Sequence, residues 1–281
     1  MCTVISHANI KGGVGKSTGN CTMAVVLAKC GYKVLIIDND PQGNASYLFG
    51  MMQTGEEHFT VRDLYMCPKS KLQEQVPTMV YHTPYKNIDI IVSEPAHKDT
   101  IEYASQVTDR DPRMILSNAI RPLRESYDYI IIDKNPSEDI LATNVMAACD
   151  EILAPVEMDG FSYQGLGNLF MGIEKIKSYT DLNPNLKFRG IYMVKNVRRS
   201  NVFKNVYEAY QRELGDMFFL SNIRSSLIVY ECTHQCRPLL HIKKRTAPGE
   251  DYILLMHEIG YISEQQALDL LKEHAVSPEY R

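Results

Sequence analysis

The 281-residue sequence lacks several features that would place it in a particular class of protein. No apolar run approaches the roughly 20 residues that a membrane-spanning helix requires, so no such helix is expected. No internal repeat, low-complexity segment or long Gly/Ser-rich linker divides the chain. The sequence therefore predicts a single domain over residues 1–281, which is long enough to bury a sizeable core.

A positive net charge and a metal-binding set of cysteines are also lacking. The formal net charge is −4, so binding to nucleic acid or to an anionic membrane would need a local basic patch. Seven scattered cysteines, in a chain with no signal peptide, predict reduced thiols in the cytoplasm. Cys232 and Cys236 could share one helix face, but no second pair completes a zinc set. Free thiols are therefore the preferred interpretation.

Short apolar segments alternate with segments of helical periodicity. Strands are predicted at residues 3–6, 33–38, 87–93, 127–133, 151–157 and 188–194, with a further short one at 215–221 as an open alternative. Helices are predicted at residues 17–30, 97–106, 111–125, 162–179 and 200–214 and over about the last forty residues. Residues 50–85 are irregular and suit an insertion at the rim. This order predicts an α/β fold with a doubly wound, mostly parallel sheet covered by helices on both faces.

A glycine-rich stretch, "NIKGGVGKST" at residues 9–18, lies between the first predicted strand and helix. Its end, Gly15-Lys16-Ser17, fits a phosphate-binding loop, although Ile10 stands where the usual pattern has its first glycine. Glycines let successive backbone N–H groups face phosphate oxygens, and the helix start adds its positive end. Lys16 would reach the β- and γ-phosphates, and Ser17 would offer a hydroxyl to Mg²⁺. The predicted nucleotide-binding residues here are Lys11, Gly12, Gly13, Val14, Gly15, Lys16, Ser17 and Thr18.

The segment "KGGVGKST" resembles the deviant Walker A signature of the ParA/MinD family of P-loop ATPases. The resemblance extends along nearly the whole chain and is closest to Soj-type ParA partition proteins. It includes "IIDNDPQGNAS" (36–46), "YDYIIIDKNPS" (127–137) and "ECTHQCRPLL" (231–240). It implies binding of ATP and Mg²⁺, slow ATP hydrolysis and an ATP-bound homodimer. In such a dimer Lys11 would cross the interface to the partner's nucleotide, whereas the residues alone would favour a solvated lysine at a loop edge.

Three aspartates follow predicted strands, where ligands of parallel sheets bind. The resemblance implies that Asp40 positions or activates the attacking water, and that Asp38 and Asp133 lie near Mg²⁺, acting through bound waters. The alternative for each aspartate is a cap on the next element. One departure from the family is Lys134-Asn135, where a small residue and a proline are usual.

A second departure from the family is Ser221-Asn222, where a proline near the adenine is common. Asn196 is the predicted adenine contact.

Basic residues gather late in the chain. The resemblance implies non-specific DNA binding, in the ATP-bound dimer, by Arg198, Arg199 and Arg224. The run Lys243-Lys244-Arg245 is equally well explained as a solvated charge run. Pairing two monomers doubles the number of phosphate contacts, which makes DNA binding plausible despite the acidic net charge. The first strand begins by about Thr3, so we expect no helix-turn-helix domain before the phosphate loop.

The leading hypothesis is a DNA-partitioning ATPase that is cytoplasmic and nucleoid-associated. Its ATP-bound dimer would bind DNA, and a ParB-like centromere-binding partner would stimulate hydrolysis and release. The alternative is a MinD-like positioning ATPase that acts at a membrane or on a protein partner. The acidic residues of the C-terminal helix disfavour the membrane role. A nitrogenase-like iron protein and a tyrosine kinase are disfavoured because the sequence lacks the required cysteine and the terminal tyrosine cluster.

Overall fold

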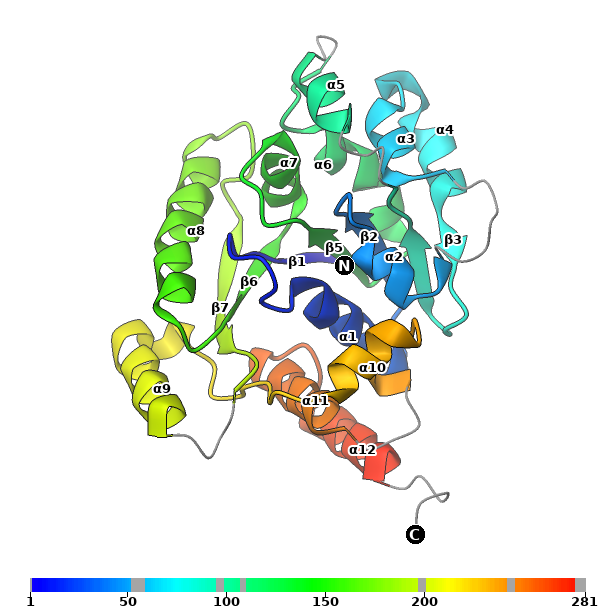
Figure 1. Cartoon of the computed structure of the whole chain (residues 1–281). Helices are drawn as coiled ribbons and strands as arrows, with labels where there is room; N and C mark the ends of the chain where they lie inside the picture. The colour runs from blue at the N-terminus through cyan, green and yellow to red at the C-terminus, as the bar shows by residue number, and fades with distance from the viewer. Residues whose placement is uncertain are drawn as a thin grey trace.

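One seven-stranded sheet organises the molecule (Figure 1). The computed structural model describes residues 2–51, 59–94, 99–106, 110–196, 201–241 and 246–275. The strand order is β3-β4-β2-β5-β1-β6-β7, and all neighbours are parallel except β3 and β4. The strands are β1 (Thr3–His7), β2 (Val34–Asn39), β3 (Tyr81–His82), β4 (Ile88–Ile91), β5 (Tyr129–Lys134), β6 (Glu151–Val156) and β7 (Lys187–Met193).

Helices cover both faces of this sheet. One layer contains α3 (Val61–Met66), α6 (Ile115–Ile120), α7 (Ile140–Ala148) and α8 (Gly160–Ser178), with α9 (Asn201–Leu214) at the β7 edge. The other contains α1 (Lys16–Lys29), α2 (Asn44–Leu48), α10 (Ile228–His234), α11 (Ala247–Ile259) and α12 (Glu264–Ala275). The remaining helices are α4 (Leu72–Gln75) and α5 (Thr100–Gln106).

The strands are apolar on both sides because both sides are buried. In β2, Leu35 and Ile37 belong to the core on the α7 side, whereas Val34 and Ile36 belong to the core on the α1 side. This continuous apolar character is typical of parallel strands between two helical layers, and it explains why the sequence predicts these strands. The predicted α/β fold with a doubly wound, mostly parallel sheet is confirmed.

Two local predictions need correction. Residues 215–221 form no strand: Gly215–Met217 is a 3-10 turn, and Phe218 makes a single bridge to Ile191 beside β7. The stretch 50–85 is not irregular in its described part. It contains α3, two 3-10 turns, α4 and β3, which adds the antiparallel edge strand. The prediction failed because these elements are short and carry little periodic signal.

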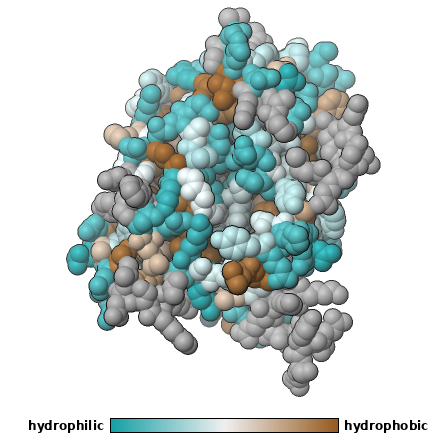
Figure 2. Space-filling model, viewed as in Figure 1, coloured by the Kyte–Doolittle hydropathy of each residue, from teal (hydrophilic) through white to brown (hydrophobic). Residues whose placement is uncertain are grey.

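The C-terminal helix packs on the body of the protein, as predicted. Ala267 and Leu270 of α12 are buried, whereas Leu268 is 44% exposed. None of the helices in the described part of the chain has the length and apolar character needed to cross a membrane. In the face shown in Figure 2, apolar residues form small separate patches among hydrophilic ones. The seven cysteines are free thiols, as predicted.

Gly19 allows α1 to approach the sheet closely. A Cβ atom at this position would lie 2.8 Å from the Tyr192 hydroxyl oxygen and 3.1 Å from Cε1 of His7, and both rings are fully buried. We expect Gly19→Ala to lower the free energy of unfolding by about 1–3 kcal/mol, because a packed core cannot absorb the methyl group. Denaturant unfolding measures this change.

Gly167→Ala is the matched control, since Gly167 is exposed on α8 and a Cβ atom there meets nothing within 4 Å. This variant should gain roughly 0.5–1 kcal/mol through the better helix propensity of alanine. Equal unfolding midpoints for the two variants would contradict the close packing at Gly19.

Candidate active site

The glycine-rich loop connects the end of β1 to the start of α1, as predicted. Gly13 and Gly15 have φ angles of 77° and 80°, which only glycine adopts without strain. Gly15 is the N-cap of α1, and no side chain caps the helix. No acidic residue lies in the first turn of α1. Its N–H groups and positive helix end are therefore available to an anion.

A pocket of about 440 Å³ opens above this loop. Its lining combines the loop with the segments after β2 and β5 and with one residue of α10: Gly12, Gly13, Gly15, Lys16, Ser17, Thr18, Asp40, Gln42, Asn44, Tyr47, Leu48, Lys134, Pro136 and Thr233. Six of the eight predicted loop residues line it. Val14 is instead fully buried in the core, and Lys11 does not line the pocket.

Lys16 is held inside this pocket. Its side chain is buried, and its Nζ donates a hydrogen bond to the carbonyl oxygen of Lys11 at 2.9 Å, across the loop. Burial lowers the pKa of Lys16, and the nearby charges of Asp133 and Asp40 oppose that shift. The ammonium group is therefore preorganised beside the N–H groups of the loop, where it can bind a phosphate.

Asp38 and Asp133 lie side by side because β2 and β5 pair in register at these residues. Asp38 Oδ2 accepts hydrogen bonds from the backbone N–H and the hydroxyl of Ser46, both at 2.7 Å. Asp133 Oδ1 accepts one from Asn20 Nδ2 at 2.8 Å, and the Oδ1 of Asn20 accepts one from His7 Nδ1 at 2.7 Å. Burial raises the pKa of both carboxyl groups, because their charged forms are desolvated.

The oxygen atoms near Asp133 fit a magnesium site that is completed by phosphate. Asp133 Oδ2 is buried and has no hydrogen-bond partner among the described residues, and Ser17 lies beside this carboxylate. Within the described ranges, no three His, Cys, Asp or Glu side chains converge to hold a metal ion alone. Mg²⁺ is commonly bound by one or two carboxylates with phosphate and water, so this sparse set suits it.

Asp40 lies at the same pocket and is 5% exposed. Its Oδ1 accepts a hydrogen bond from the N–H of Gln42 at 2.9 Å, and its carbonyl oxygen accepts one from the Ser93 hydroxyl at 2.6 Å. The carboxylate is thus fixed at the pocket wall, where it could orient a water molecule.

Lys11 pairs with acidic residues of its own chain. Its Nζ lies 2.6 Å from Glu157 Oε2 and also contacts Asp159. Glu157 additionally pairs with Lys195 at 2.7 Å, and Lys195 donates to the carbonyl oxygen of Gly13 at 2.5 Å. Sequence reasoning missed these three residues, Glu157, Asp159 and Lys195, although Glu157 directly follows the strand β6 and so lies at the predicted ligand edge.

A second cavity of about 230 Å³ adjoins the loop and shares Gly13, Gly15, Thr18 and Thr233 with the first pocket. Apolar side chains of Val194, Ile223, Val229, Tyr230 and Tyr252 are part of its lining. Asn196 lies two residues beyond Val194 and is 2% exposed. Neither polar atom of its side-chain amide has a hydrogen-bond partner in the described part of the chain.

The predicted DNA-binding residues fall into two groups. Arg198 and Arg199, like the run 243–245, lie outside the described residues. Arg224 is described, and its guanidinium pairs with Asp251 through two hydrogen bonds from Nε, at 3.0 and 2.8 Å, and one from Nη2 at 2.7 Å. Asp251 is 2% exposed, so the charge of Arg224 is already balanced by an internal carboxylate that sequence reasoning missed.

Lys134, the first departure from the family pattern, lines the pocket above the glycine-rich loop. It is 3% exposed. Burial, reinforced by the nearby charge of Lys16, lowers the pKa of Lys134 to about 8.

Comparisons with known proteins agree with this arrangement. Residues 2–188 match the family described as an AAA domain. The chromosome partitioning protein ParA of Caulobacter vibrioides is 30% identical over 258 residues, covering 91% of this chain and 93% of that protein. The sporulation initiation inhibitor protein Soj of Bacillus subtilis is 28% identical, with 92% of this chain and 99% of that protein covered.

A solved structure shows the same fold. The complex of a Cyanothece McdA variant with ATP matches with a TM-score of 0.77 at 19% identity, covering 92% of this chain and 96% of that one. The match of residues 2–188 to the family model and the identity with ParA over most of both chains, together with the signature loop and its lysine pair, establish that the chain belongs to the ParA/MinD family of P-loop ATPases with a deviant Walker A loop.

Proposed function

We propose that this protein is a DNA-partitioning ATPase. The observation that carries the proposal is the placement of the two loop lysines: Lys16 lines the pocket, whereas Lys11 does not line it, is 27% exposed and pairs with Glu157. One lysine can bind the nucleotide of its own chain, and the other can reach the nucleotide of a second copy. The names of the ParA and Soj relatives support partitioning as the process that this ATPase drives.

ATP hydrolysis would use the residues that converge on the pocket. Lys16 and the loop N–H groups would bind the β- and γ-phosphates and offset the charge of the transition state. Ser17 and Asp133, with Asp38 behind them, would hold Mg²⁺, which neutralises phosphate charge when bound. Asp40 would accept a hydrogen bond from a water molecule and direct its oxygen at the γ-phosphorus. The bond between the β,γ-bridging oxygen and the γ-phosphorus breaks, giving ADP and inorganic phosphate.

The cavity next to the loop suits the adenine base. Its apolar walls can cover the faces of a flat ring. Asn196 adjoins the lining residue Lys195 in sequence and pairs with the lining residues Ile223 and Arg224 through its backbone, and its side-chain amide has a donor and an acceptor that are unpaired among the described residues. Adenine presents a complementary donor and acceptor, so Asn196 would orient the base and satisfy its own buried polar atoms.

Dimerisation would require Lys11 to exchange partners. In one protomer its ammonium group is neutralised by Glu157 and Asp159. The γ-phosphate of a second protomer's ATP offers a denser negative charge, so ATP would favour the exchange more than ADP does. The proposed dimer is therefore coupled to the nucleotide.

The ATP-bound dimer would bind DNA without sequence preference through Arg198 and Arg199 of both copies. Arg224 is the weaker candidate, since it balances the buried carboxylate of Asp251. A ParB-like centromere-binding protein would stimulate hydrolysis and release the protein from DNA. The protein would then act in the cytoplasm on the nucleoid.

Mg²⁺ should stabilise the protein strongly only together with ATP, because phosphate oxygens complete the metal's coordination. We expect a small rise in the melting temperature with Mg²⁺ alone, a larger one with ATP and EDTA, and the largest with both. Thermal unfolding measures each increment. In Asp133→Asn the increment that Mg²⁺ adds to ATP should vanish, whereas Asp216→Asn, an exposed site, should keep it. An undiminished increment in Asp133→Asn would contradict the magnesium assignment.

Lys11→Ala should bind ATP nearly as well as the original protein but should not dimerise. Sedimentation velocity with a non-hydrolysable ATP analogue measures the dimer fraction. Lys29→Ala is the matched control, since the Lys29 side chain is 24% exposed and paired with Glu273, compared with 27% exposure for Lys11. The trans role of Lys11 is wrong if the Lys11→Ala protein still forms the ATP-dependent dimer.

Binding to a random-sequence DNA duplex should require ATP and should weaken with salt. Fluorescence anisotropy would compare ATP–Mg²⁺ with ADP–Mg²⁺ at two salt concentrations, with Lys16→Ala as the nucleotide-free control. Replacing Arg198 and Arg199 by alanine should reduce the slope of log K against log salt by about one for each DNA phosphate that these arginines bind. The double variant Lys69→Ala/Lys71→Ala is the matched control, because it removes the same positive charge from two exposed residues elsewhere on the protein. Equal binding with both nucleotides, or none, would overturn the DNA proposal.

A further inference from the structure

Lys134 is a buried cation with few partners. It follows Asp133 at the end of β5 and is 3% exposed. Among the described residues its Nζ makes a single long hydrogen bond, to the carbonyl oxygen of Ser137 at 3.5 Å, and no carboxylate oxygen lies within ion-pair distance. An ammonium group carries three donors, and burying a charge with so little compensation is costly. Such a residue needs another anion nearby.

The acidic residues close to Lys134 have other donors. Asp139 caps α7 by accepting hydrogen bonds from the N–H groups of Leu141 and Ala142 at 2.9 and 3.1 Å. Asp133 accepts from Asn20, and Asp40 accepts from Gln42. Their charges attract Lys134 at longer range while the charge of Lys16 repels it. Lys16 and Lys134 thus line one pocket, and neither forms an ion pair with a carboxylate in the described part of the protein, although Asp133 and Asp40 act on both at longer range.

The position of Lys134 marks the phosphate end of the pocket. The end of the pocket toward the proposed adenine cavity is marked by the residues that line both: Gly13, Gly15, Thr18 and Thr233. Lys134, Pro136 and Asp40 line the pocket but not that cavity. The segment with Lys134 and Pro136 also lies against the loop, since a Cβ atom on Gly12 would be 4.0 Å from Pro136 Cγ.

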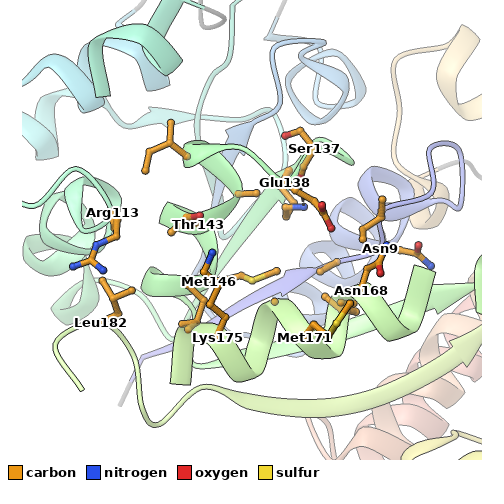
Figure 3. A pocket seen from close by; sticks show the side chains of 18 of the residues that line it. Asn9, Arg113, Ser137, Glu138, Thr143, Met146, Asn168, Met171, Lys175 and Leu182 are labelled. Carbon is orange, nitrogen blue, oxygen red and sulfur yellow. Dashed lines mark hydrogen bonds between the residues drawn. The ribbon is translucent and has the colours of Figure 1, made fainter. Parts of the chain in front are cut away.

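Lys134 also lines a groove of about 560 Å³ between α7 and α8, whose walls include Asn9, Glu138 and Met146 (Figure 3). It therefore stands in the wall between the groove and the nucleotide pocket. On the groove side, the lining includes Glu138 and Ser137, and the Ser137 carbonyl oxygen accepts the one long hydrogen bond of Lys134. The pocket side offers room for a phosphate chain, whose several negative charges would attract the ammonium group more strongly than a single neutral carbonyl oxygen does.

We propose that Lys134 binds the terminal phosphate of ATP within its own chain, as a second ammonium group opposite Lys16. This inference rests on the proposed ATPase function and adds a residue that discriminates between nucleotides. A γ-phosphate between the two lysines satisfies both buried cations with charge-assisted hydrogen bonds. ADP ends one phosphate earlier, so it leaves Lys134 without this partner. Lys134 should therefore favour ATP over ADP.

The test compares the affinity for a non-hydrolysable ATP analogue with that for ADP by calorimetric titration. In Lys134→Met we expect the affinity for the analogue to fall about tenfold or more, as expected when one charge-assisted hydrogen bond is removed. The affinity for ADP should change much less. Lys134→Arg should recover part of the discrimination, because it keeps the charge. Lys175→Met is the matched control: Lys175 is exposed and lines the groove but not the nucleotide pocket.

Several outcomes would overturn the proposal. Equal weakening for both nucleotides in Lys134→Met would show a structural role. Tighter binding would show that repulsion by Lys16 dominates. If Lys134→Met does not fold, the same titrations of Lys134→Arg and Lys134→Gln decide. If the ratio of the affinity for the ATP analogue to that for ADP equals the ratio of the original protein in both variants, the contact is rejected. The proposed ATPase function is tested separately by the same titrations. It is wrong if the original protein binds neither the ATP analogue nor ADP, or if Lys16→Ala binds them as tightly as the original protein does.

Discussion

Parallel pairing of β1, β2 and β5 is the constraint on which the rest of the structure depends. Strands that run in the same direction end at the same edge of the sheet, so the segments that follow them meet there although they are distant in sequence. The register places Asp38 next to Asp133, and the pairing of β1 with β5 places the glycine loop beside Asp133. Helices on both faces bury this edge from the sides, which lowers the local dielectric and strengthens every charge interaction within it.

Charge balance around this edge follows from that burial. Charges of both signs gather near this edge: Lys11, Lys16, Lys134 and Lys195, with Asp38, Asp40, Asp133, Glu157 and Asp159. Some of these charges are paired directly, as Lys11 is with Glu157, and others, such as Lys134, are held apart. A nucleotide with Mg²⁺ would redistribute these pairings, because it brings both a polyanion and a cation into one pocket. In the proposed function, this redistribution makes dimerisation depend on which nucleotide is bound.

The structure also separates basic residues that the sequence groups together. The resemblance assigns Arg224 the same role as Arg198 and Arg199, but Arg224 closes a hydrogen-bonded ion pair with a nearly inaccessible carboxylate on α11. Removing one partner of such a pair leaves the other buried and costs several kcal/mol, of the order of 3–5. Weaker DNA binding on replacing Arg224 would therefore mix a structural effect with any direct effect on the DNA interface. Arg198 and Arg199 give the clearer test of that interface.

The sequence by itself determined the six parallel strands of the sheet, most helices and the phosphate loop. These features follow local patterns in the sequence, and each lies where it is predicted: the apolar strands buried on both faces, the helix that glycines precede, and the aspartates at strand ends. The short elements between residues 59 and 85 and the turn at Gly215–Met217 escape prediction because they carry too few residues for periodicity to register. Tertiary structure alone decided the partners of charged groups. Lys11 and Glu157 are 146 residues apart in the sequence, Arg224 and Asp251 are 27 apart, and Asn20 and Asp133 are 113 apart. No local sequence pattern encodes that such distant residues will meet in space.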